Sequence, residues 1–196
     1  KHWPMVAEGK KGIDSLTDYL LTFDQGQPFQ AMIAPASVGG RLFYNNELTG
    51  FNFDRMNGHL RDAFSILKVL LDKSPSPGFY IGSKSISEYL PGLELETPLE
   101  LHSPLVSETQ VDPTIWIGNA TRVATHNDDS ENVACVAVGR RRFTLFPPEQ
   151  LANLYIGPLD ASPAGRAISL VDFAKPDLTQ FPKFVQAMKH AQVIEL

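Results

Sequence analysis

The sequence predicts a mainly β domain with flanking helices, folded as an antiparallel barrel or sandwich. Several short strand-like segments separated by turns fill the second half of the chain, which is typical of these folds. The 15 prolines and 14 glycines are spread along the chain rather than gathered into a linker, which favours many short elements. The 196 residues, 43% hydrophobic and 20% charged, fit a single domain of medium size.

Residues 1–77 are expected to form the helical and mixed part of this domain. Ser15 is expected to cap a short helix, because apolar residues follow it at helical spacing. Two short strands are predicted next, at 29–33 and 41–44. Residues 58–71 then carry an amphipathic pattern that predicts a helix packed on a core.

Residues 78–196 are expected to supply the barrel. Aromatic, β-branched and alternating segments predict strands here, followed by a helix and a last extended segment: strands at 79–81, 114–117, 133–138, 140–146 and 167–173, a helix at 178–189, and 191–196. The run 133–138 is almost wholly apolar, as in a strand buried on both faces. Cys135 within it is therefore expected to be a buried small hydrophobe and not a nucleophile.

The composition excludes several classes of function. Seventeen Lys and Arg against 22 Asp and Glu give a net charge of −5, with no basic run, so neither nucleic acid nor an anionic membrane surface is expected as a partner. The apolar stretches are too short to span a bilayer. One cysteine permits no internal disulfide. We expect a cytoplasmic protein.

A His-x-Asp pair is the first candidate for chemistry. If residues 125–128 are extended, His126 and Asp128 lie on one face, because alternate residues of a strand share a face. An imidazole and a carboxylate so placed can bind adjacent positions on one metal ion, as in the facial triad of non-haem Fe(II) enzymes. A surface histidine beside an acidic loop is the competing interpretation.

An arginine-rich strand follows this pair. Within 140–146, Arg141 shares a face with Phe143 and Leu145, so its guanidinium is expected near an apolar wall, where it favours an anionic partner. The anion is either a bound carboxylate or one from the protein, and a side chain that reaches solvent is the third interpretation.

The segment 117–150 resembles the cupin-like JmjC family of Fe(II)- and 2-oxoglutarate-dependent oxygenases, of the asparaginyl-hydroxylase type with bacterial homologues. The shared features are a His-x-Asp pair, an Asn six residues after the His, a Gly, a basic residue two further on, and Leu-Phe-Pro-Pro. In this chain they are His126, Asp128, Asn132, Gly139, Arg141 and the run 145–148. The resemblance implies a double-stranded β-helix, the jelly-roll barrel of the cupins.

The resemblance also implies roles for individual residues. His126 and Asp128 would bind Fe(II). Arg141, in place of the family's lysine, and Tyr80 would bind the distal carboxylate of 2-oxoglutarate, and Asn132 would line the pocket near this co-substrate. The family has a threonine three residues before the metal histidine, but this chain has Val123. Either Thr121 or Thr125 substitutes for it, or the co-substrate binds differently.

The second metal histidine of the family is not found. Relatives place it after a Pro-Gly-Asp turn in an aromatic strand, and the chain ends at Leu196, where that turn would begin. His190 is expected at a helix C-terminus and His59 at a helix start, and neither fits the role. We therefore expect a barrel truncated at its C-terminus, with its last strands and third ligand missing.

The predicted function is that of an oxygenase, most simply a hydroxylase, that uses Fe(II) and 2-oxoglutarate on a protein side chain or a small molecule. Whether this chain is itself an active enzyme is left open by the missing ligand. A non-catalytic cupin-like module that binds a metal, a ligand or a partner protein is the alternative, and a metal-dependent isomerase is a weaker one. A homodimer also stays open, because relatives often dimerise through C-terminal helices.

Overall fold

A computed structural model describes residues 3–99, 112–158, 162–163 and 165–196. The chain divides into two compact units, each formed from two stretches of sequence. Unit 1 comprises Lys1–Gly39 and Asp54–Thr121, and unit 2 comprises Gly40–Phe53 and Arg122–Leu196. Within the described residues no helix is long and apolar enough to cross a membrane.

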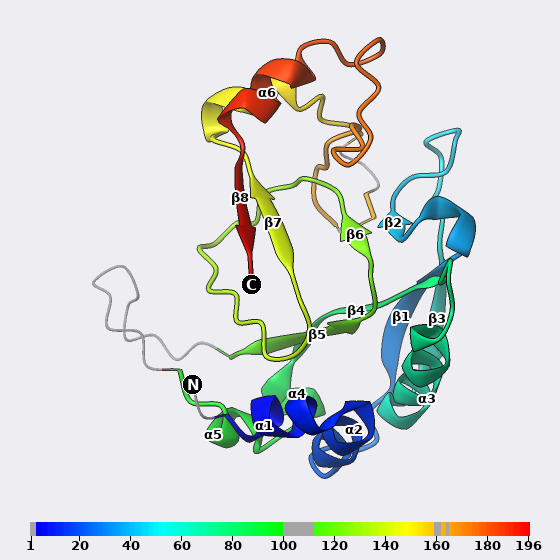
Figure 1. Cartoon of the computed structure of the whole chain (residues 1–196), viewed down its shortest axis with the longest axis vertical. Helices are drawn as coiled ribbons and strands as arrows, with labels where there is room; N and C mark the ends of the chain where they lie inside the picture. Colours follow the sequence, from blue (N-terminus) through cyan, green and yellow to red (C-terminus); the bar gives the residue numbers. More distant parts are fainter. Residues whose placement is uncertain (1–2, 100–111, 159–161, 164) are drawn as a thin grey trace. The chain divides into compact units, whose positions relative to one another are not determined.

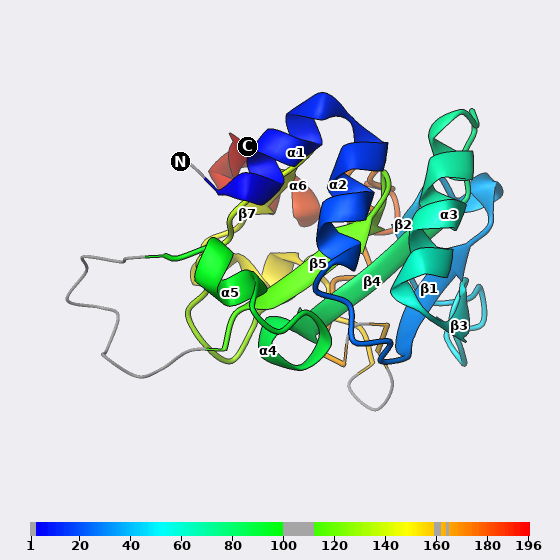
Figure 2. The ribbon, with the colours of Figure 1, turned by 90° about the horizontal axis from the view of Figure 1, so that it is seen from below.

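Unit 1 is a four-stranded antiparallel sheet in the order β3-β1-β4-β5, with helices against one face (Figures 1 and 2). Its elements in chain order are α1 Pro4–Lys11, α2 Ile13–Leu21, β1 Phe29–Ala34, η1 Ala36–Val38, β3 Asp54–Gly58, α3 Leu60–Leu71, β4 Gly78–Ser85, α4 Ile86–Tyr89, α5 Leu93–Glu96 and β5 Thr114–Gly118.

The sheet and helices of unit 1 bury matching apolar faces. On α3, the buried residues recur at helical spacing, as the sequence predicted: Leu60, Ala63, Phe64, Leu67 and Leu70. On β4, Phe79 and Ile81 share a face and are 0% and 2% exposed. Gly118 of β5 lies so close to this strand that a Cβ atom would come within 2.7 Å of the Phe79 carbonyl oxygen.

Unit 2 contains two separate two-stranded sheets. β2 Arg41–Leu42 pairs in parallel with β6 Arg122–Val123, and β7 Arg142–Leu145 pairs antiparallel with β8 Gln192–Glu195. Between β7 and β8 the chain forms η2 Pro148–Asn153 and α6 Phe184–His190, which leads directly into β8 (Figure 1). None of the sheets formed by the described residues closes on itself.

Two small cores hold unit 2 together. In one, the fully buried Phe184 of α6 packs with three other buried residues, Leu154, Val171 and Ala187. In the other, Tyr44, Ala124 and Ile168 are buried together. Tyr44 also donates a hydrogen bond to the Pro158 carbonyl oxygen at 3.1 Å.

Several predicted elements differ from the structure. Residues 133–138 form no strand, and Val133 is 55% exposed, because no described strand pairs with this run. Cys135 is exposed and not buried. Residues 167–173 make only isolated bridges, and helix α6 begins at Phe184 and not at 178, because Pro182 cannot donate a backbone hydrogen bond.

The helix predicted after Ser15 begins earlier. α2 starts at Ile13, after Gly12, so Ser15 lies inside the helix and its hydroxyl donates to Glu8 instead of capping. Gly12 separates α1 from α2 with a φ of 131°, a conformation that glycine adopts without steric cost. Strand β3 at Asp54–Gly58 was not predicted, because only Met56 in it is apolar.

Candidate functional site

The backbone around His126 is fixed by a neighbouring segment of unit 2. His126 forms an isolated β-bridge with Ile168, and the Ser169 backbone N–H donates to the Thr125 carbonyl oxygen at 2.8 Å. Ile168 and the preceding Ala124 are both buried. The residues before His126 therefore anchor it to a core, while its side chain stays 26% exposed.

A backbone carbonyl sets the tautomer of His126. Its Nδ1 lies 2.8 Å from the Ala124 carbonyl oxygen. Because a carbonyl oxygen only accepts, Nδ1 carries a proton, so Nε2 is the nitrogen whose lone pair can bind a metal ion. A metal-binding histidine usually has this arrangement, in which the nitrogen that does not bind the metal donates to a fixed acceptor.

Asp128 faces the free nitrogen of this imidazole. Its Oδ1 lies 3.6 Å from His126 Nε2. An ion bound at about 2.1 Å by each atom would span this gap with an angle of about 120°, and an angle of 90° needs a separation of about 3.0 Å. The Asp128 side chain is 49% exposed and would have to rotate to reach that separation. Both residues therefore fit adjacent positions on one metal ion.

The two neighbouring carboxylates of this loop, Asp128 and Asp129, have different partners. Asn132 Nδ2 donates to Asp128 Oδ2 at 2.8 Å. Asp129, the next residue, instead forms an ion pair with Arg166. Asp128 therefore remains the carboxylate that faces His126. Arg166 had no role in the sequence prediction, because 37 residues separate it from Asp129 and no local pattern joins them.

Arg141 lies at the edge of the β7–β8 pair. Its backbone N–H and carbonyl both bond to Leu196 at 2.9 Å, and its guanidinium carbon lies 5.1 Å from the centre of the Phe143 ring. The predicted apolar neighbour on the same face is thus present. Arg141 is exposed, and within the described ranges no carboxylate pairs with it.

The other two predicted site residues, Tyr80 and Thr125, belong to different units. Tyr80 belongs to unit 1, where it is half-buried on β4 between Met32 of β1 and Gly118 of β5. Thr125 lies next to His126, and its backbone carbonyl accepts the hydrogen bond from Ser169. The structure therefore brings together His126, Asp128 and Asn132, with Thr125 adjacent in the chain.

A third metal ligand is not found in the part of the chain that is described. No group of three or more His, Cys, Asp or Glu residues there could hold a metal ion. His59 precedes α3 and His190 ends α6, where its Nδ1 lies 2.8 Å from the Gln186 carbonyl oxygen, as predicted. His2 and His102 lie outside the described residues.

An arginine–aspartate cluster supports the segment behind His126. Asp172 accepts a hydrogen bond from Arg122 at 2.8 Å, and its other oxygen lies 3.9 Å from Arg41 Nε. Arg41 also donates to the Leu170 carbonyl oxygen and stacks 3.5 Å from the Phe43 ring centre. Burial lowers the pKa of the Arg41 guanidinium, and Asp172 opposes this effect. The cluster fixes residues 170–172 against β2 and β6.

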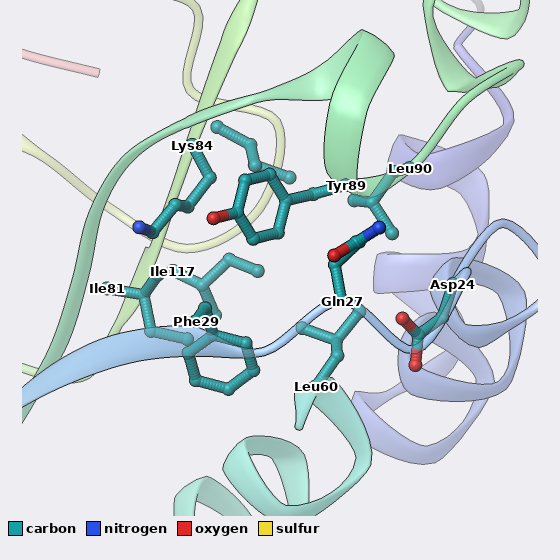
Figure 3. Close-up of a pocket in the computed structure, with 10 residues that line it drawn as sticks. Asp24, Gln27, Phe29, Leu60, Ile81, Lys84, Tyr89, Leu90 and Ile117 are labelled. Carbon is teal, nitrogen blue, oxygen red and sulfur yellow. The ribbon is translucent and has the colours of Figure 1, made fainter. Parts of the chain in front are cut away.

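Unit 1 contains a separate hollow of about 330 Å³, including its open mouth (Figure 3). Apolar side chains form most of its wall, and the Lys84 ammonium lies 5.1 Å from the Tyr89 ring centre at its edge. Its lining comprises Asp24, Gln27, Phe29, Leu60, Ile81, Lys84, Tyr89, Leu90, Ile115 and Ile117. None of the predicted site residues lines it.

The open antiparallel sheets with flanking helices and the His126–Asp128 pair fit the cupin-like class of protein. A family model described as "Cupin-like domain" matches residues 1–196, so the chain belongs to the cupin-like domain family. Its homologues include JmjC-domain proteins, which confirms the predicted resemblance.

Three relatives indicate the range of this family. The chain is 29% identical over 104 residues to Lysine-specific demethylase JMJ31 of Arabidopsis thaliana, which is 53% of this chain and 18% of that protein. It is 30% identical over 125 residues to Lysine-specific demethylase 8 of Xenopus tropicalis, covering 62% and 27%. It is 30% identical over 71 residues to tRNA wybutosine-synthesizing protein 5 of Danio rerio, covering 36% and 20%. The matched segments thus span about a quarter or less of these relatives' lengths.

Proposed function

We propose that this chain carries part of the active site of an Fe(II)- and 2-oxoglutarate-dependent oxygenase. The observation that carries the proposal is the pairing of His126 Nε2 with Asp128 Oδ1 at 3.6 Å, with the histidine tautomer set by a buried backbone segment. Homology to JmjC proteins supports the same class of activity.

Each residue of the site would have a defined role. His126 and Asp128 would hold two adjacent positions on the iron, and the third protein ligand would come from outside the described residues. Bound iron and 2-oxoglutarate supply oxidative decarboxylation coupled to hydroxylation of a substrate C–H bond. Arg141 would bind the distal carboxylate of 2-oxoglutarate, because its guanidinium has an apolar ring beside it and no carboxylate partner in the described part of unit 2. Thr125, which precedes His126 in unit 2, would add a hydroxyl contact to this co-substrate.

The proposed substrate is a protein side chain or a small molecule. Two relatives are named as lysine-specific demethylases and a third as a tRNA-modifying protein, so the names alone do not select a substrate class. The net charge of −5 favours a non-nucleic-acid substrate, because phosphate backbones are bound by basic surfaces. We propose further that the strands belong to a double-stranded β-helix, and the antiparallel β7–β8 pair supports this architecture.

A non-catalytic cupin-like module is the second candidate. The specific observation in its favour is the lack of a third ligand among the described residues. Val123 on β6, at the position where the family has a threonine, also favours it. Such a module would bind a metal, an acid or a partner protein without turnover.

Anaerobic titration with Fe(II) and 2-oxoglutarate tests the proposal. The charge-transfer band of the ternary complex should form with the unaltered chain and disappear in His126→Ala and Asp128→Ala. Arg141→Ala should keep the band but require more 2-oxoglutarate. Asn127→Ala is the matched control from the same loop. Absence of Fe(II) binding in the unaltered chain would contradict the proposal, and binding without succinate formation would favour the non-catalytic module.

A further inference from the structure

We propose that the hollow of unit 1 is a binding site for a small apolar monocarboxylate, such as an acid with a phenyl or branched alkyl body. Its lining comes from strands β1, β4 and β5, from α3 and α4, and from the loop after α2 (Figure 3). The hollow therefore lies between the sheet and the helices of unit 1. It is a site in addition to the oxygenase centre proposed above.

A bulge in β4 turns Lys84 toward the hollow. Ile81 pairs with Ile117 of β5. Lys84 pairs with Ile115, so two residues of β4 lie opposite a single residue of β5 between these pairs. Strict alternation would place Lys84 and Ile81 on opposite faces of the sheet, because they are three residues apart. The extra residue brings Lys84 onto the face of Ile81, and bulges that re-aim a side chain in this way are frequent beside functional sites.

The inner wall of the hollow is apolar. Phe29, Ile81 and Leu90 are 4%, 2% and 2% exposed, and Leu60 and Ile117 complete this wall. Such a wall offers no hydrogen-bond partner, so it favours a hydrocarbon group that leaves water. A volume of about 330 Å³ with the open mouth included limits the occupant to a small molecule.

The charged groups of the lining select the rest of the ligand. Lys84 is half-buried with its ammonium 5.1 Å from the Tyr89 ring centre, and no carboxylate in the described part of unit 1 forms an ion pair with it. A carboxylate of the ligand would supply this partner. Asp24 lies on the other side of the hollow from Lys84, beside Gln27 (Figure 3). Its negative charge disfavours a second anionic group on the ligand, so a monocarboxylate fits better than a dicarboxylate.

The hollow differs from the site that the family resemblance implies for 2-oxoglutarate. Tyr80, the residue of unit 1 expected to bind that co-substrate, stands between Phe79 and Ile81 on β4. Its side chain therefore points to the opposite face of the sheet from Ile81. Ile81 lines the hollow and Tyr80 does not.

Methyl NMR of the full chain tests the proposal without metal or 2-oxoglutarate. The probe is 3-phenylpropionate, added to protein labelled with ¹³C at the isoleucine δ1 methyl groups. The phenyl ring should shift the signals of the three isoleucines in the lining: Ile81, Ile115 and Ile117. The isoleucines of unit 2 should not shift and serve as the internal control. The neutral 3-phenylpropionamide should bind about fivefold more weakly, as expected for loss of a partly exposed ion pair, and 2-oxoglutarate should shift none of the three signals.

Two variants separate the charge from the cavity. Lys84→Met keeps an unbranched stem and removes the ammonium, so the acid and the amide should bind within about twofold of each other. Lys73→Met, at an exposed lysine of unit 1 outside the lining, is the matched control and should retain the fivefold preference. Gln27→Trp places a ring at the mouth of the hollow and should abolish the shifts from both probes.

The contrary results are equally specific. If neither probe shifts the three isoleucine signals, the hollow is not a ligand site. Equal binding of acid and amide to the unaltered chain, or a preference that persists in Lys84→Met, would overturn the role of Lys84. Shifts of the same signals by 2-oxoglutarate would overturn the selection of a monocarboxylate. Because no arm uses iron, each of these results leaves the titration of the proposed oxygenase centre as a separate test.

Discussion

Replacement of Asp172 by asparagine should destabilise unit 2 without changing the shape of the side chain. In the unaltered chain, Asp172 Oδ1 accepts from Arg122 Nη1 at 2.8 Å and from the Ala174 N–H at 3.0 Å. The Oδ1 atom of an asparagine can still accept both hydrogen bonds. The change removes the negative charge between Arg122 and Arg41 and replaces Oδ2, which lies 3.9 Å from Arg41 Nε, by an amide donor. These two arginines are paired neighbours on the parallel strands β6 and β2, so their like charges would lose the anion that separates them.

The size of the effect follows from burial and geometry. The Arg122 bond changes from one between two ions to one between an ion and a neutral amide, and we expect this to cost about 1 kcal/mol. The Arg41 contact is longer, at 3.9 Å, and the three side chains are 22–31% exposed, which screens their interaction. Together these losses predict a decrease of about 2 kcal/mol in the free energy of unfolding of unit 2.

Hydrogen exchange measured by mass spectrometry is the suitable assay. Both tryptophans, Trp3 and Trp116, belong to unit 1, so tryptophan fluorescence reports the wrong unit. Exchange in peptides from 165–196 should accelerate in Asp172→Asn. Glu195→Gln is the matched control, since it removes the exposed ion pair with Arg142 on the same unit and should cost less than about 1 kcal/mol. Equal effects of the two substitutions would refute the reasoning.

Three further predictions follow from burial and exposure. Phe184→Ala should lower the free energy of unfolding by about 3–5 kcal/mol, because its side chain is fully buried; a urea series with exchange detection in unit 2 checks this. Burial raises the pKa of Tyr44 in the folded chain. Its contribution to the free energy of unfolding is therefore complete below about pH 10, where the tyrosine of the unfolded chain begins to ionise. This contribution is lost as the pH rises through the pKa of the folded state. Alkaline unfolding should therefore be shallower in Tyr44→Phe, and an unchanged curve would contradict this. Cys135 is exposed and should react with a thiol reagent in the folded chain as fast as in urea, whereas protection would indicate burial.

Local periodicity predicted the elements that bury one continuous face. The helix at Leu60–Leu71 and the strands at Gly78–Ser85 and Thr114–Gly118 agree with the sequence pattern, because each packs against neighbours in its own unit. The strand at Gln192–Glu195 also lies where an extended segment was expected. All four residues of that strand are exposed, so its pairing with β7, and not burial, stabilises it.

The same reasoning was wrong where burial depends on a partner strand. Residues 133–138 are the most apolar run of the second half, yet no described strand pairs with them and Val133 is exposed. Hydrophobicity indicates that a segment can be buried, but hydrogen-bonded neighbours decide whether it is. The barrel required pairing of this kind, and the sheets of the described residues are open.

For the candidate site, the sequence singled out His126, Asp128 and Asn132 but did not predict the contacts that hold them. Alternation placed His126 and Asp128 on one side, and the structure brings their side chains together. The Ala124 carbonyl contacts His126, and the Asn132 amide contacts Asp128. Arg166 forms an ion pair with Asp129, the residue that follows Asp128. A backbone carbonyl has no sequence signature, and a partner 37 residues away has no spacing rule.

The arrangement of His126 and Asp128 therefore depends on packing in unit 2 as well as on the His-x-Asp motif. Segment 168–172 joins the parts: Ile168 pairs with His126, Ser169 bonds Thr125, and Asp172 binds the arginines of β2 and β6. A perturbation of Asp172 should then loosen the backbone that orients the imidazole, although the side-chain partners of Asp172 are Arg41, Arg122 and the Ala174 N–H. If Asp172→Asn weakens Fe(II) binding as well as stability, the orientation of the ligand depends on this segment. If stability falls while Fe(II) affinity is unchanged, the Ala124 carbonyl alone suffices to orient His126.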